Sequence, residues 1–170
     1  MQNRTQFTVG FGAPPIPPTR DGADSDGMPF SPSPLRCRIL VVEDSEGWQE
    51  LLAVMIRKVP ELELAGCAPS AREAMSLFSQ VQPDLLILDW RLRDGDVLAV
   101  LRLAQRARPA CTVVVFTKSI SARERARCVA GGADHFVSKE EPQKLALLLE
   151  LAGENFRAAL RPSASNQPNL

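Results

Sequence analysis

Five side chains that could take part in chemistry come directly after stretches of apolar residues. Glu43 and Asp44 follow the run RILVV, Asp89 follows LLIL, Thr117 follows TVVVF, and Lys139 follows HFVS. Three carboxylates brought together repel one another unless a cation lies among them, and an open site rich in oxygen atoms suits Mg²⁺. The residue types therefore indicate a magnesium site beside a hydroxyl group and an ammonium group.

The elements that would position these groups alternate along the chain. Short apolar runs predict strands over residues 38–42, 62–68, 85–89, 112–116 and 135–138, and apolar residues at helical spacing follow each of them. Ser70 with Glu73, and Ser121 with Glu124, have the spacing of capping boxes that begin helices. Pro142 lies in the first turn of a final helix rich in leucine.

This alternation predicts an α/β fold of the (βα)5 type, a doubly wound five-stranded parallel sheet covered by helices on both faces. Right-handed crossovers leave few topologies, and we expect the flavodoxin-like strand order 2-1-3-4-5. In that order the first and third strands are neighbours, and ligands bind beyond the carboxyl ends of the strands where the order reverses. The five polar side chains are therefore expected to converge at one edge of the sheet.

Taken singly, each of these residues has an ordinary structural explanation. An Asp after a strand often forms a turn, Thr117 could serve a strand or a turn, and Lys139 could be a solvated side chain. Their joint placement at one predicted edge favours a functional site.

Composition limits the classes of partner. Twenty basic residues balance twenty acidic ones in 170 residues, so the chain has no overall attraction for nucleic acid or a membrane surface. No apolar run approaches the roughly 20 residues of a membrane span. The four cysteines are far apart and lack metal or redox spacing, which indicates buried thiols in a reducing compartment. We expect a cytoplasmic protein that binds neither nucleic acid nor membrane.

Residues 36–156 form the predicted folded domain. Residues 1–35 are rich in Pro, Gly and Ser and are expected to be a disordered leader, and residues 157–170 a disordered tail. Translation could begin at Met1 or at Met28, which stands just before the folded pattern. The residues after the final helix are too few for an output domain, which needs on the order of 50 residues.

Four motifs resemble, in order and in spacing, the receiver domain of bacterial two-component response regulators. They are ILVVEDS, DLLILDWRLRDGD, VVVFT and GADHFVSK. The resemblance implies that Asp89 is the phosphoacceptor. It also implies that Glu43, Asp44 and Asp89 hold Mg²⁺ with help from the backbone carbonyl of Arg91.

The resemblance assigns roles to the later motifs as well. Thr117 and Lys139 would contact the bound phosphoryl group, and Thr117 and Phe136 would act together as a switch. The phosphoryl group would come from a phosphohistidine on a histidine kinase or a histidine phosphotransfer protein. A downstream protein of unknown identity would bind the face formed by the fourth helix, fifth strand and fifth helix. We therefore expect a stand-alone response regulator receiver that is not an enzyme, beyond slow self-dephosphorylation.

The chain departs from the family pattern at several positions. Lys118 stands where a small residue is usual and could control access to the site, and Glu140 stands where Pro usually follows the lysine. Arg93 replaces a frequent Pro. These departures leave open a degenerate receiver that acts as a phosphorylation-independent interaction module. A phosphatase of the haloacid dehalogenase type would need a second Asp two residues after the nucleophile, where Arg91 stands.

Overall fold

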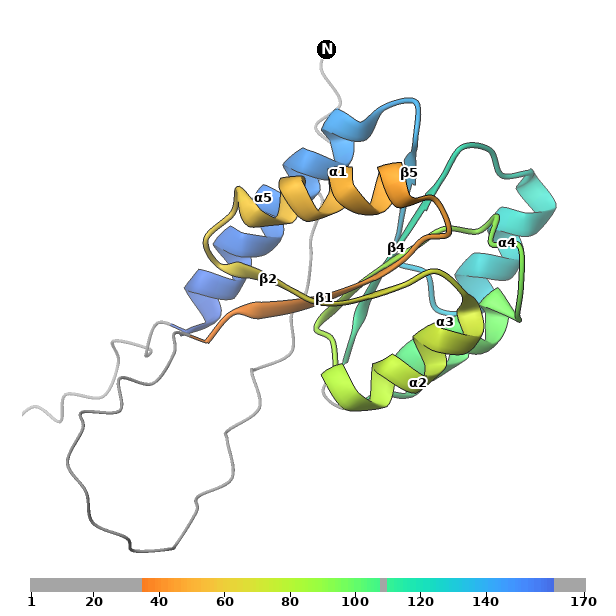
Figure 1. Ribbon diagram of the computed structural model, residues 1–170, viewed down its shortest axis with the longest axis horizontal. Coiled ribbons are helices and arrows are strands. Elements are labelled where there is room, and N and C mark those ends of the chain that lie inside the picture. Colours follow the sequence, from red (N-terminus) through yellow and green to blue (C-terminus); the bar gives the residue numbers. More distant parts are fainter. Residues whose placement is uncertain (1–34, 108–109, 161–170) are drawn as a thin grey trace, which may run out of the picture.

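The computed structural model describes residues 35–107 and 110–160, which form a five-stranded parallel sheet with helices on both faces (Figure 1). The strand order is β2-β1-β3-β4-β5, as predicted. The elements in chain order are β1 Cys37–Val42, α1 Glu46–Arg57, β2 Leu62–Ala68, α2 Ala71–Val81, β3 Leu85–Leu88, α3 Val97–Arg106, β4 Thr112–Thr117, α4 Ala122–Ala130, β5 His135–Ser138 and α5 Pro142–Leu160.

The sheet separates two hydrophobic cores. Helices α1 and α5 cover one face, and α2, α3 and α4 cover the other (Figure 1). Along β1, Ile39 and Val41 belong to the first core, and Leu40 and Val42 belong to the second. This division follows from the alternation of side chains along a strand. Burial on both faces explains why β3 reads LLIL with all four residues buried.

Polar side chains cap three of the helices at their amino ends. Ser121 and Glu124 form the predicted capping box of α4. At α2 the Ser70 hydroxyl accepts the Glu73 N–H at 3.1 Å, whereas the Glu73 carboxylate accepts the Ser70 hydroxyl rather than a backbone N–H. Asp96 caps α3 by accepting the Leu98 N–H at 3.0 Å. These caps fix where each helix begins relative to the strand before it.

The predicted leader, residues 1–35, and the predicted tail, residues 157–170, lie at the two ends of the chain. All but one residue of the leader falls on residues 1–34, and most of the tail falls on residues 161–170. Both ranges lie outside the described residues. Helix α5 continues to Leu160 and so runs past residue 156, where the folded domain was expected to end.

The four cysteines are free thiols. Burial raises the pKa of the Cys37 thiol to about 12 and that of Cys128 to about 11, so both stay protonated at neutral pH. They act as small buried side chains rather than as nucleophiles. Within residues 35–107 and 110–160, no helix has the length and apolar character needed to cross a membrane.

Gly153 in α5 provides a test of how the first core is packed. A Cβ at this position would lie 2.5 Å from Val59 Cγ1 and 3.4 Å from Glu61 Oε2. Gly153→Ala should lower the free energy of unfolding by about 1–3 kcal/mol through overpacking, although Ala normally favours a helix. Urea denaturation measures this change. Gly47→Ala in α1, where the added Cβ would meet no atom within 4 Å beyond its chain neighbours and the backbone of its own helix, should leave stability equal or higher. A Gly153→Ala protein as stable as the parent would contradict this packing.

Candidate functional site

The predicted polar residues meet at the carboxyl edge of the sheet. Strand pairing places Val42 of β1 beside Leu88 of β3, so Glu43 and Asp89, the next residues, are neighbours. The Asp89 N–H donates to the Val42 carbonyl at 2.9 Å, and the Lys139 N–H donates to the Thr117 carbonyl at 3.1 Å. Backbone hydrogen bonds that extend the sheet therefore hold these positions in place.

The Lys139 ammonium group bridges two buried carboxylates. Its Nζ lies 2.6 Å from Glu43 Oε2 and 2.7 Å from Asp89 Oδ2. The three side chains are only 7%, 1% and 4% exposed, respectively. Buried charges of this kind are tolerated only when they are paired. The rings of Trp48 and Phe116 lie within 6 Å of the ammonium and complete its surroundings.

Two opposing effects act on the pKa of the Glu43 carboxyl. Burial raises the pKa of its carboxyl above the usual value, while the ion pair with Lys139 acts in the opposite direction. Its Oε1 accepts the Ser45 N–H at 3.2 Å. Its Oε2 is buried and accepts no hydrogen bond of good geometry within the described part of the chain, so its contact with Lys139 is an ion pair only.

These carboxylates fit a magnesium ion. One oxygen from each of Glu43, Asp44 and Asp89 lies within 4.8 Å of the others. Mg²⁺ prefers oxygen ligands and is commonly held by one or two carboxylates together with water and phosphate oxygens. The buried Oε2 of Glu43 is held by its ion pair with Lys139 alone, so this oxygen is available as a ligand if the lysine moves. This geometry is consistent with the predicted acidic cluster of Glu43, Asp44 and Asp89.

The loop after β3 ties the site to α4 in a way that the sequence did not predict. The Arg91 N–H donates to Asp89 Oδ1 at 2.9 Å, and the Arg91 guanidinium lies 3.1 Å from Glu124 Oε1. The same guanidinium donates to the Ser119 carbonyl at 3.4 Å. Hydrogen bonds from Ser121 and Trp90, together with the charge of Arg91, lower the pKa of Glu124 to about 2. One residue thus contacts the central carboxylate and the first turn of α4.

Thr117 and Phe136 lie beside a cavity of about 330 Å³. Thr117 is 4% exposed, and its hydroxyl has no hydrogen-bond partner within residues 35–107 and 110–160. Phe136 is half-buried, and the Arg125 guanidinium carbon lies 4.0 Å above the centre of its ring. The cavity offers space for both side chains to move, and the stacked arginine was not predicted.

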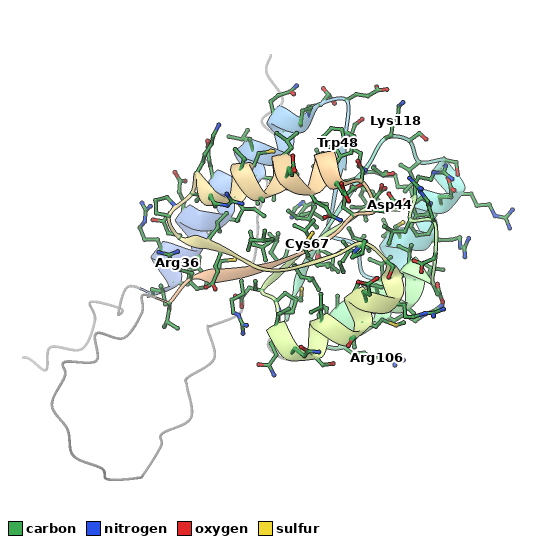
Figure 2. The ribbon with its side chains drawn as sticks, in the orientation of Figure 1. Arg36, Asp44, Trp48, Cys67, Arg106 and Lys118 are labelled. Carbon is green, nitrogen blue, oxygen red and sulfur yellow. The ribbon has the colours of Figure 1, made fainter. Side chains whose placement is uncertain are left out.

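Lys118 is exposed and lies on the loop between β4 and α4, where it projects outward from the molecule (Figure 2). Asp44 lies at the edge of the sheet in the same view, and its carboxylate pairs with Arg93 rather than with Lys118. Control of access by Lys118 therefore stays a prediction.

Comparison with known proteins identifies a family and several relatives of this chain. The family model for the response regulator receiver domain matches residues 39–150. The chain is 33% identical over 158 residues to protein-glutamate methylesterase/protein-glutamine glutaminase 1 of Dechloromonas aromatica, covering 81% of this chain and 45% of that protein. It is 35% identical over 129 residues to the corresponding protein 2 of Pseudomonas aeruginosa, covering 74% and 36%.

Solved structures show the same fold. The response regulator domain of CheB from Thermotoga maritima superimposes with a TM-score of 0.60 at 23% identity, covering 75% of this chain and 99% of that one. The N-terminal domain of an uncharacterized protein from Wolinella succinogenes gives a TM-score of 0.62 at 26% identity, covering 73% and 98%.

The relatives correct the expectation that the protein is not an enzyme. Both relatives named above carry the name of an enzyme, protein-glutamate methylesterase/protein-glutamine glutaminase. The expectation rested on the small number of residues after the last helix. That number says nothing about the activities of longer proteins that contain a similar domain. The chain spans less than half the length of these two relatives, and a stand-alone receiver is not confirmed.

Removal of the bridging ammonium tests the electrostatics of the site. Lys139→Met should lower the free energy of unfolding by about 3–5 kcal/mol at neutral pH, because it leaves two carboxylates buried without a partner. Burial already raises the pKa of Glu43, and loss of the cation raises it further, so the part of the loss that comes from Glu43 should shrink as the pH falls through this raised value and be absent below 4.5, its ordinary pKa. Chemical denaturation at several pH values measures both effects.

Lys144→Met is the matched control for this substitution. Lys144 also lies 2.7 Å from a carboxylate, that of Glu141, but the two side chains are 60% and 45% exposed. Its loss should cost less than about 1 kcal/mol. Equal costs for the two substitutions, or a Lys139→Met cost independent of pH, would show that the buried bridge is not present in solution.

Proposed function

The chain belongs to the response regulator receiver domain family, and we propose that it accepts a phosphoryl group on Asp89 and signals through protein–protein contacts. The arrangement of Asp89 carries this proposal. Its carboxylate is buried at the carboxyl edge of the sheet, 2.7 Å from the Lys139 ammonium and beside two further acids. A carboxylate held next to a fixed cation suits attack on a centre whose oxygens are negatively charged.

The proposed transfer begins from a phosphohistidine on a histidine kinase or a histidine phosphotransfer protein. A carboxylate oxygen of Asp89 attacks the phosphorus, the phosphorus–nitrogen bond breaks, and the histidine nitrogen keeps the electron pair. Lys139 and the Thr117 hydroxyl then hold oxygens of the new acyl phosphate. Mg²⁺, bound by Glu43, Asp44, Asp89 and the Arg91 carbonyl, would supply charge neutralisation during transfer.

The unsatisfied hydroxyl of Thr117 supports a switch. Because this buried oxygen has no hydrogen-bond partner among the described residues, a phosphoryl oxygen would offer it one, and its movement would enlarge the cavity beside Phe136. Phe136 would turn inward and leave Arg125. The surface formed by α4, β5 and α5 would change as a result, and we propose that the downstream protein binds there.

The proposal also covers access to Asp89 and the location of the protein in the cell. Lys118 would narrow the approach to Asp89 when its side chain folds back over the loop. Because the proposed donor is a histidine kinase or a histidine phosphotransfer protein, we also propose a cytoplasmic location.

The relatives favour one output in particular. Receiver-containing proteins 33% and 35% identical to this chain are named as protein-glutamate methylesterase/protein-glutamine glutaminase. We therefore propose control of such an enzyme as a second candidate function. The alternative of a phosphorylation-independent interaction module predicts that the chain binds its partner without acquiring phosphate.

Incubation with acetyl phosphate and Mg²⁺ tests the proposed phosphoacceptor. Intact mass should increase by a single phosphate in the parent protein and in Asp94→Asn, which alters an exposed carboxylate of the same loop. Asp89→Asn should acquire none, because it removes the nucleophilic oxygen. A fully labelled Asp89→Asn protein would assign the phosphate elsewhere. Unlabelled parent protein with intact fold would favour the phosphorylation-independent module.

A further inference from the structure

A second cation, Arg93, contacts the acidic cluster and has no part in the proposed transfer. It lies in the loop between β3 and α3, and its Nε is 2.9 Å from Asp44 Oδ2. The Arg93 side chain is 87% exposed, whereas that of Lys139 is 7% exposed. Among the described residues, the cluster therefore holds one buried cation, Lys139, and one exposed cation, Arg93, on a surface loop.

The two cations divide the carboxylates between them. Lys139 pairs with Glu43 and Asp89, and Arg93 pairs with Asp44. Asp44 Oδ2 already has a guanidinium at ion-pair distance, so a metal ion that uses this carboxylate must either displace the arginine or tolerate a positive charge close beside it. Like charges at such a distance repel, and the exposed side chain is the one that can leave without loss of packing.

We propose that Arg93 is a tethered competitor of Mg²⁺ for Asp44. It occupies the carboxylate when the metal is absent and is displaced as the metal binds. The inference rests on the proposed magnesium site and adds a residue that sets its affinity. It also links metal binding to the loop that carries Arg91, because this loop loses an anchor to Asp44 when Arg93 is displaced.

The size of the effect follows from the exposure of the pair. Exposed ion pairs are weak, so the competition should change the dissociation constant for Mg²⁺ by about two- to fivefold. The sign of the change in Mg²⁺ affinity on removal of Arg93 distinguishes a competitor from a supporting residue. A residue that supported the metal site would weaken binding when removed, whereas removal of a competitor strengthens binding.

Titration with Mg²⁺, followed by isothermal calorimetry and by tryptophan emission, to which Trp90 beside Asp89 and Trp48 beside Lys139 both contribute, tests the proposal. Arg93→Gln, which removes the charge and keeps much of the length, should bind Mg²⁺ about two- to fivefold more tightly than the parent. Arg93→Lys, which keeps the charge, should stay closer to the parent. Arg102→Gln is the matched control, since Arg102 is 54% exposed and pairs with Asp96 at 3.7 Å. It loses the same charge and should leave the affinity unchanged.

The outcomes separate this inference from the function on which it rests. Parent protein that shows no response to Mg²⁺ would overturn both the metal site and the competition. Parent protein that binds Mg²⁺, with Arg93→Gln equal to it or weaker, would overturn the competition alone. Equal tightening in Arg93→Gln and Arg102→Gln would also overturn it, because the effect would then be one of overall charge.

Discussion

The Lys139 ammonium that bridges Glu43 and Asp89 is the contact on which the arrangement of the site depends. Three nearly buried side chains from the ends of three strands meet here, and the Lys139 Nζ lies within 2.7 Å of an oxygen of each carboxylate. Without the cation, two carboxylates would face each other in a setting where neither can be hydrated. The strand order brings β1 and β3 together, and the backbone hydrogen bond between Lys139 and Thr117 places the lysine opposite them. The fold thus provides both the acids and the charge that makes their proximity tolerable.

Around this centre, arginines connect the acids to the parts of the molecule that could respond. Arg93 reaches Asp44 from the loop after β3, and Arg91 reaches Glu124 at the start of α4. Arg125 then stacks on Phe136 of β5. A change in charge at Asp89 would alter contacts along this series, since the Arg91 N–H donates directly to the Asp89 carboxylate. The series ends at the surface of α4 and β5, where we propose that a partner binds.

The fold and the positions of the main site residues could be predicted from the sequence, because they depend on the periodicity of apolar residues and on the polar residues at strand ends. The run LLIL and the capping residues Ser121 and Glu124 are local signals. The parallel strand order followed from the alternation of strands with helices and from the right-handed crossovers that connect them. The pairs Arg93–Asp44 and Arg91–Glu124 could not be predicted, because they join long side chains from separate loops. The likeness to methylesterase enzymes was also missed, since the receiver motifs carry no information about what accompanies them in other proteins.

A crystal structure of the protein with Mg²⁺ and beryllium trifluoride, a stable mimic of a phosphoryl group, is the most direct test of Asp89 as phosphoacceptor and of Lys139 as its movable partner. We predict that the mimic bonds to a carboxylate oxygen of Asp89 and that Lys139 Nζ leaves Glu43 to contact a fluorine atom. A mimic bonded elsewhere, or a Lys139 that still bridges Glu43 and Asp89 at saturating concentrations of mimic, would contradict it.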